Sequence, residues 1–149
     1  MKVDGTKGYA FPAREILPEE VLSVSHFARV IGSPDRAFYS TEEARAAGYA
    51  ARPLPRGLPL FFNAITEAEL LETLGIIYGK TLAAGLEVEY GVVVTEQDPL
   101  VGQARVVDAY ERVGKDGTLR HFLVLETEYR NRQGDMVSRT RVTFIERAQ

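Results

Sequence analysis

The fold class is decided by residues 105–130, which read RVVDAYERVGKDGTLRHFLVLETEYR. Two runs rich in β-branched and aromatic residues flank the segment Gly114-Lys115-Asp116-Gly117, and this arrangement is typical of a β-hairpin. In the second run every other residue, from Leu119 to Tyr129, falls on one mostly apolar face, while charged residues alternate on the other. The pattern predicts two antiparallel strands, over residues 105–113 and 119–130.

The flanking sequence extends this hairpin into a meander. Residues 86–95 are rich in β-branched residues, and residues 136–147 form a last candidate strand after a polar turn. Before them, the segment from Leu58 to Gly75 has apolar residues at helical spacing and predicts one long helix, or two helices with a break near Asn63. Helices followed by strands predict an α+β fold in which the long helix covers one face of an antiparallel sheet.

Two shorter helices are expected nearer the N-terminus. Pro18 opens the first, which the apolar spacing carries to Ile31, and Ser40 caps the second, which ends at Gly48. The length of 149 residues is that of a single domain, and residues 1–7 are expected to form a loose end.

Composition excludes several classes of protein. The chain has 18 Lys and Arg against 21 Asp and Glu, so it offers no broad basic face for a nucleic acid. It has no cysteine and only two histidines, which argues against a metal site. It has neither an apolar signal core nor a run long enough to cross a membrane. We therefore expect a cytoplasmic protein without metal, nucleic-acid or membrane partners.

Residues 27–35 (FARVIGSPD), 40–49 and 53–58 (PLPRGL), in this order, resemble the MaoC-like dehydratases, also called R-specific enoyl-CoA hydratases, which have the hot dog fold. Residues 27–35 (FARVIGSPD) are similar to the family string Phe-Ala-x-x-x-Gly-Asp-x-Asn-Pro-x-His. Residues 40–49 resemble the short helix that follows it, and residues 53–58 (PLPRGL) resemble the entrance to the central helix. The resemblance implies a single hot dog domain over residues 1–149, with the sheet wrapped around a long central helix.

When the family's catalytic residues are compared with this sequence one by one, one catalytic element is retained and the others are replaced. In the family, an Asp and a His move protons, and a backbone N–H of glycine polarises the thioester carbonyl. Ser33 stands at the Asp position and Phe38 at the His position, whereas the glycine is retained as Gly57. Arg56 replaces the histidine before that glycine, and Asp35 is the carboxylate nearest to the altered string. The pattern resembles the hot dog half that lacks the catalytic Asp/His pair.

The substrate implied by the resemblance is an acyl thioester. Coenzyme A or phosphopantetheine would then be part of the substrate, and no separate cofactor is expected. Arg56 is a candidate for its phosphates, and the aromatic residues suit an acyl chain. The candidate substrate-binding residues are Phe38, Tyr39, Arg56, Gly57, Phe61, Phe62 and Asn63.

Several functions remain open from the sequence. The first is a non-catalytic subunit that shapes the acyl pocket of a hydratase complex and pairs with a catalytic MaoC-like subunit. The second is an active (R)-specific enoyl-thioester hydratase or dehydratase, a homo-oligomer whose rearranged site uses Asp35 or Ser33 with Gly57. The third is a stand-alone acyl-CoA binding module, and a thioesterase with a carboxylate on the central helix is a fourth. Each hot dog sheet leaves an edge strand open, so we expect at least a dimer.

Overall fold

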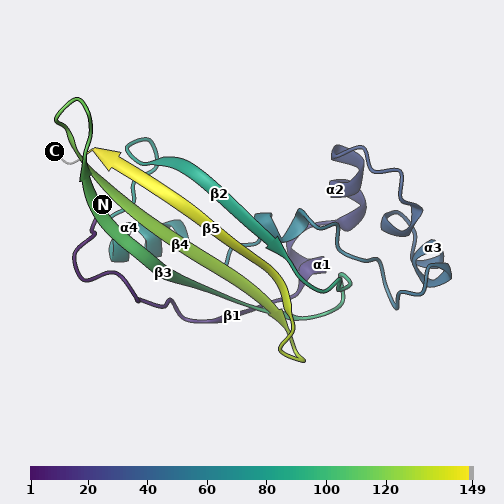
Figure 1. The fold of residues 1–149 in the computed structure, drawn as a ribbon. Helices are drawn as coiled ribbons and strands as arrows, with labels where there is room; N and C mark the ends of the chain where they lie inside the picture. Colours follow the sequence, from purple (N-terminus) through teal and green to yellow (C-terminus); the bar gives the residue numbers. More distant parts are fainter. Residues whose placement is uncertain (148–149) are drawn as a thin grey trace.

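The computed structural model describes residues 1–147. Its centre is a twisted five-stranded antiparallel sheet in the order β1-β3-β4-β5-β2, with β2 and β1 at the two edges (Figure 1). The predicted α+β class and the predicted hairpin are confirmed. The strands are β1 (Arg14–Ile16), β2 (Leu82–Tyr90), β3 (Leu100–Val113), β4 (Leu119–Asn131) and β5 (Met136–Arg147).

The two faces of the sheet differ in chemistry. Residues that lie opposite one another in adjacent antiparallel strands share a face, so the register sorts the side chains. One such row is apolar and lies on the inner face: Leu86, Val142, Leu125 and Val106. The neighbouring row is charged and lies on the outer face: Glu87, Arg141, Glu126 and Arg105. The inner face therefore faces the core, and the outer face carries a ladder of ion pairs, with Arg141 Nε 2.8 Å from Glu126 Oε2.

The long central helix predicted from the sequence is absent. Residues 58–75 form a 3-10 turn (Leu58–Phe61), an extended segment and the eight-residue helix α4 (Glu67–Leu74). The break starts at Phe62, whose backbone is extended (φ −80°, ψ 143°) and whose carbonyl accepts a 2.8 Å hydrogen bond from the hydroxyl of Tyr129. A new helix can start only at Thr66, where a capping box with Glu69 satisfies free N–H groups. Of the two alternatives, two helices with a break near Asn63 is closer to the structure than one long helix.

The remaining helices are also short. The single helix expected from Pro18 to Ile31 is divided into α1 (Pro18–Val21) and α2 (Val24–Val30). Leu22 is extended between them, and the side chain of Ser23 caps α2 by accepting from the backbone N–H of His26. Helix α3 (Thr41–Ala46) has the predicted Ser40 cap, and Arg36–Phe38 forms a 3-10 turn. Helices α2 and α3 lie beyond one end of the strands (Figure 1).

The N-terminal segment is packed against the sheet and α4. Residues 1–7, expected to form a loose end, include the buried side chains of Val3 and Thr6, and the Lys2 N–H donates to the Leu74 carbonyl. Hydrogen bonds from residues 8–11 and pairing by β1 then cover the edge of β3 from Leu100 to Val106. The outer edges of β2 and of residues 107–113 of β3 are left without a paired strand among the described residues.

The apolar core consists of two clusters along the inner face. One lies under α4 and includes Leu74, Val106 and Leu123. The other lies at the end of the sheet nearer α2 and includes Leu58, Phe62 and Tyr129. The second cluster supports the turn that contains Gly57.

Candidate functional site

The segment before Gly57 is held in place by a short two-stranded ladder. The Leu54 N–H donates to the Val94 carbonyl at 2.8 Å, and the Glu96 N–H donates to the Arg52 carbonyl at 2.9 Å. The side chains of the same two residues also pair, with Arg52 Nε 2.8 Å from Glu96 Oε1. Because Glu96 is buried, this ion pair fixes the position of the irregular segment 52–57.

Gly57 presents a backbone donor that is not used within the chain. It precedes the 3-10 turn with φ −76° and ψ −13°, and the next N–H, that of Leu58, donates to the Pro55 carbonyl. Within residues 1–147, the N–H of Gly57 donates to no backbone or side-chain acceptor. A Cβ atom at this position would lie 3.7 Å from Phe27 Cζ, so an aromatic ring borders the glycine. A half-buried free N–H can hold the carbonyl oxygen of a ligand.

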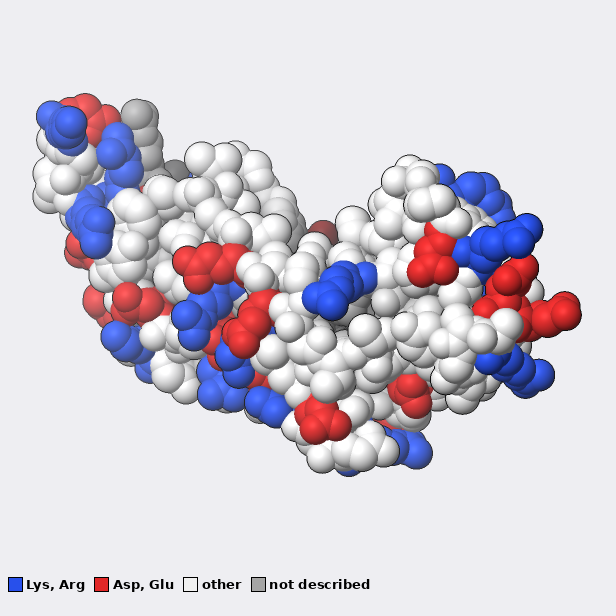
Figure 2. Space-filling model, turned by 45° about the vertical axis from the view of Figure 1, so that its right-hand side comes forward, with Lys and Arg blue, Asp and Glu red and all other residues white. Residues whose placement is uncertain are grey.

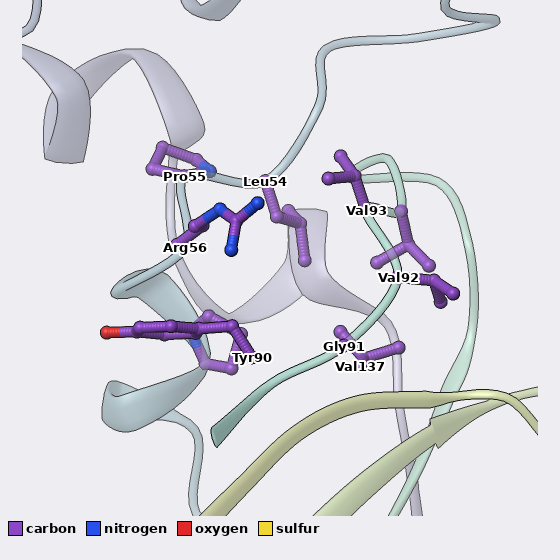
Figure 3. Close-up of a pocket in the computed structure, with 10 residues that line it drawn as sticks. Leu54, Pro55, Arg56, Tyr90, Gly91, Val92, Val93 and Val137 are labelled. Atoms are coloured by element: carbon purple, nitrogen blue, oxygen red, sulfur yellow. The ribbon is translucent and has the colours of Figure 1, made fainter. Parts of the chain in front are cut away.

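An apolar cavity of about 20 Å3 lies beside this turn, between residues 54–59 and residues 90–94. Figure 3 shows Arg56 between Leu54 and Tyr90, with Val92 and Val93 across the opening. The Arg56 guanidinium carbon lies 5.8 Å from the centre of the Tyr90 ring, a cation–π contact. In contrast to Arg52, Arg56 is exposed and has no carboxylate within 4 Å among the described residues.

The segment at positions 33–39 is occupied by turn contacts. Asp35 is exposed, and its carboxylate accepts from the N–H of Ala37 at 3.0 Å, which caps the 3-10 turn after it. The carbonyl of Ser33 accepts a 2.6 Å hydrogen bond from the hydroxyl of Tyr39. These contacts make the segment a stable turn, and they give Asp35 and Ser33 structural partners.

The predicted acyl-binding aromatic residues separate into two groups. Phe61 is exposed and its ring lies edge-on to that of Phe27, with centroids 5.6 Å apart, next to Gly57. Phe62 is buried against Tyr129, and Phe38 packs on the same core cluster, so both contribute to the core. The side chain of Asn63 is exposed.

Sequence reasoning missed part of the cavity wall. Tyr90 and the segment Val92–Val94 come from the end of β2, far from Gly57 along the chain. The apolar run Gly91-Val92-Val93-Val94 was a usable signal, since it follows a strand without continuing the alternation of apolar and polar residues. Nothing in the sequence singled out Tyr90, or Phe27 as a neighbour of Gly57.

Residues 1–147 show neither the features of a metal site nor those of a membrane-spanning helix. They contain no cluster of three or more histidine, aspartate or glutamate side chains placed to hold a metal ion. None of their helices is long and apolar enough to cross a membrane.

Comparison with solved structures identifies the fold. The chain matches the C-terminally truncated HadBC (3R-hydroxyacyl-ACP dehydratase) complex of Mycobacterium tuberculosis with a TM-score of 0.72 and 19% identity, over 97% of this chain and 99% of that chain. The R-hydratase PhaJ1 of Pseudomonas aeruginosa gives a TM-score of 0.66 and 14% identity, over 96% and 83%. The ChsH1-ChsH2 complex of M. tuberculosis gives 0.65 and 14%, over 94% and 86%.

Comparison of the sequence itself identifies the family. No curated protein sequence matches the chain. A family model described as the FAS1-like, dehydratase domain region matches residues 7–140, which is most of its length. The chain therefore belongs to the FAS1-like dehydratase family, whose MaoC-like members share its hot dog fold.

Proposed function

We propose that the chain is the acyl-thioester-binding, non-catalytic subunit of an (R)-specific enoyl-thioester hydratase or dehydratase complex. One observation carries this proposal. The N–H of Gly57 is free within the described residues and lies in the turn whose residues Arg56 and Pro59 line an apolar cavity, while Ser33 and Phe38 occupy the two positions where the family has its proton-transfer pair.

Hydration of a 2-enoyl thioester needs a base for water, an acid for the α-carbon and a donor for the enolate-like oxygen. Phe38 carries no exchangeable proton, and a serine hydroxyl such as that of Ser33 is a poor base without a partner. Asp35 is engaged as a cap of the turn after it. The proton transfers are therefore assigned to a second subunit that has an intact Asp/His pair.

The remaining features suit binding of the substrate. The thioester oxygen would accept from the Gly57 N–H, and the acyl chain would lie along Phe61 and the cavity walls. The exposed guanidinium of Arg56, free of a carboxylate partner among residues 1–147, would contact a phosphate of coenzyme A or of a phosphopantetheine arm. A cavity of about 20 Å3 holds no more than one water, so this chain alone would hold the thioester and the coenzyme A arm, and a partner subunit would enclose the acyl chain.

Two measurements with crotonyl-CoA test the proposal. Calorimetric titration of the pure protein should detect binding, which Arg56→Met weakens and Arg29→Met, a change of another exposed arginine, leaves unchanged. Hydration of crotonyl-CoA should require the addition of a MaoC-like subunit with the Asp/His pair.

Other outcomes favour other functions. Turnover by the protein alone that is lost in Asp35→Ala would refute the subunit proposal in favour of an active enzyme. Binding of crotonyl-CoA with no turnover in either arrangement would favour a stand-alone acyl-CoA binding module.

A further inference from the structure

The free edge of β2 has the character of a protein interface. Seven of the 19 exposed large hydrophobic side chains of the described residues fall between residues 77 and 93. In Figure 2 the middle part of the upper margin is uncharged, whereas charged side chains lie below it and at both ends of the view. Concentrated apolar exposure of this kind marks a surface that another protein covers. The seven residues are Ile77, Tyr78, Leu82, Leu86, Tyr90, Val92 and Val93.

From Leu86 to Tyr90, the side chains of β2 alternate between the inner and the outer face of the sheet. Leu86, Val88 and Tyr90 point to the inner face, and Leu86 and Tyr90 are 58% and 41% exposed. Glu87 and Glu89 point to the outer face. A second strand that extends the sheet and keeps both inner faces on one side must place inner residues opposite inner residues.

Three registers for a second copy of the chain, with a twofold axis near the middle of the strand, come closest to this condition. An axis at Glu87 places that carboxylate directly opposite its own copy. An axis at Val88 places Glu87 opposite Glu89 of the second copy. An axis at Leu86 places the two Glu87 side chains on a diagonal, roughly 7–8 Å apart.

The third register has a further fault. The irregularity between Ala83 and Gly85 reverses the alternation along the strand, so Leu82 points to the outer face. An axis at Leu86 would then oppose Tyr90, an inner residue, to Leu82, an outer residue. Each of these three self-pairings therefore brings like charges together, and the one that separates them most also mismatches the faces.

Glu87 contributes more to the repulsion between two copies than Glu89 does. Glu89 is neutralised on its own sheet, because its Oε2 lies 2.9 Å from Arg139 Nη1. Glu87 lies opposite Arg141 in the register, but Arg141 pairs with Glu126 at 2.8 Å. Within residues 1–147, Glu87 forms no ion pair closer than 4 Å.

We infer that the β2 edge selects a different hot dog chain, one whose edge strand presents Lys or Arg opposite Glu87, over a second copy of itself. Apolar contacts from Leu86 and Tyr90 supply the attraction, and Glu87 supplies the discrimination. The inference rests on the proposed function, which requires a second subunit, and it specifies the surface and the charge of that subunit.

Sedimentation velocity with the protein itself tests the selection. Wild-type chain, Glu87→Lys chain and an equimolar mixture are compared at micromolar concentrations. In all three registers the mixture replaces at least one repulsive pair by an attractive one, so mixed dimers should form roughly two- to tenfold more tightly than wild-type dimers. Glu42→Lys, a charge reversal on α3, should give a mixture no tighter than wild type alone.

A mixture of wild type and Glu87→Lys that associates no more tightly than wild type overturns the inference. Glu87→Gln is a milder variant for the same comparison, and it should strengthen self-association by removing the repulsion. Binding of crotonyl-CoA by the monomer is measured separately. Failure of the charge selection would leave that binding intact, whereas failure of the proposed function would remove it.

Discussion

Replacing Tyr129 by phenylalanine removes the one hydroxyl that holds the extended segment after the Gly57 turn. The Tyr129 side chain is 2% exposed, and its hydroxyl donates at 2.8 Å to the carbonyl of Phe62, a residue that is 5% exposed. The ring remains in Tyr129→Phe, so packing is preserved and only the hydroxyl with its backbone hydrogen bonds is lost. A buried acceptor left without a donor costs about 1–3 kcal/mol.

The loss should lower the melting temperature by roughly 2–12 °C, since each kcal/mol corresponds to about 2–4 °C in a chain of this size. Differential scanning calorimetry or urea unfolding measures it directly. Tyr78→Phe is the matched control, because Tyr78 is 60% exposed and its change should alter the free energy of unfolding by less than about 0.5 kcal/mol. Equal stability of the two variants would show that the Phe62 carbonyl does not need this donor and that the break in the helix has another cause.

Three further results are expected. Burial raises the pKa of Tyr129 to about 12 from its ordinary 10, so stability should be unchanged below pH 10 and fall by roughly 2–3 kcal/mol as pH rises to 12, a fall absent in Tyr129→Phe. Glu96→Gln should cost about 2–3 kcal/mol in urea unfolding, because it leaves the partly buried Arg52 unpaired; an unchanged midpoint would contradict this. Gly91→Ala should cost more than about 3 kcal/mol or prevent folding, because a Cβ there would lie 1.8 Å from the Met136 carbonyl oxygen, and wild-type stability would argue against so close an approach.

Local sequence signals predicted the central hairpin well, but not the strand order or the helices. The predicted meander is wrong, because β2 pairs with β5 and not with β3, and the β-rich run at residues 86–95 lies partly in a strand that covers Leu82–Tyr90. Alternation along residues 119–130 and the turn at Gly114–Gly117 are local properties, and both appear in the structure. The long helix failed because the spacing of apolar residues from Leu58 to Leu74 fits a helix, while the hydrogen bond that breaks it comes from Tyr129 on a distant strand. A tertiary contact of this kind leaves no mark on local periodicity.

The candidate site was predictable only where the chain itself brings residues together. Arg56 and Gly57 are neighbours in sequence, so the position of Gly57 next to a residue that lines the cavity followed from the turn they form. The partner that stacks on Arg56 is Tyr90, which the register of β2 brings there across the fold. Phe61 is exposed and Phe62 is buried because the 3-10 turn ends between them, and the sequence did not predict this end.

The two edges of the sheet differ in how far other residues cover them, and this limits how chains can associate through the sheet. Residues 8–16 run along β3 and occupy its hydrogen-bonding groups from Leu100 to Val106, so no further strand can add there. Among the described residues, addition remains open at β2 and at residues 107–113 of β3, and of these two edges β2 lies in the cluster of exposed apolar side chains. A chain with one open apolar edge strand forms a closed dimer, whereas a chain with two such edges would assemble into a fibre. The short N-terminal segment thus prevents strand addition along this half of β3, while its buried side chains Phe11 and Ile16 also complete the core.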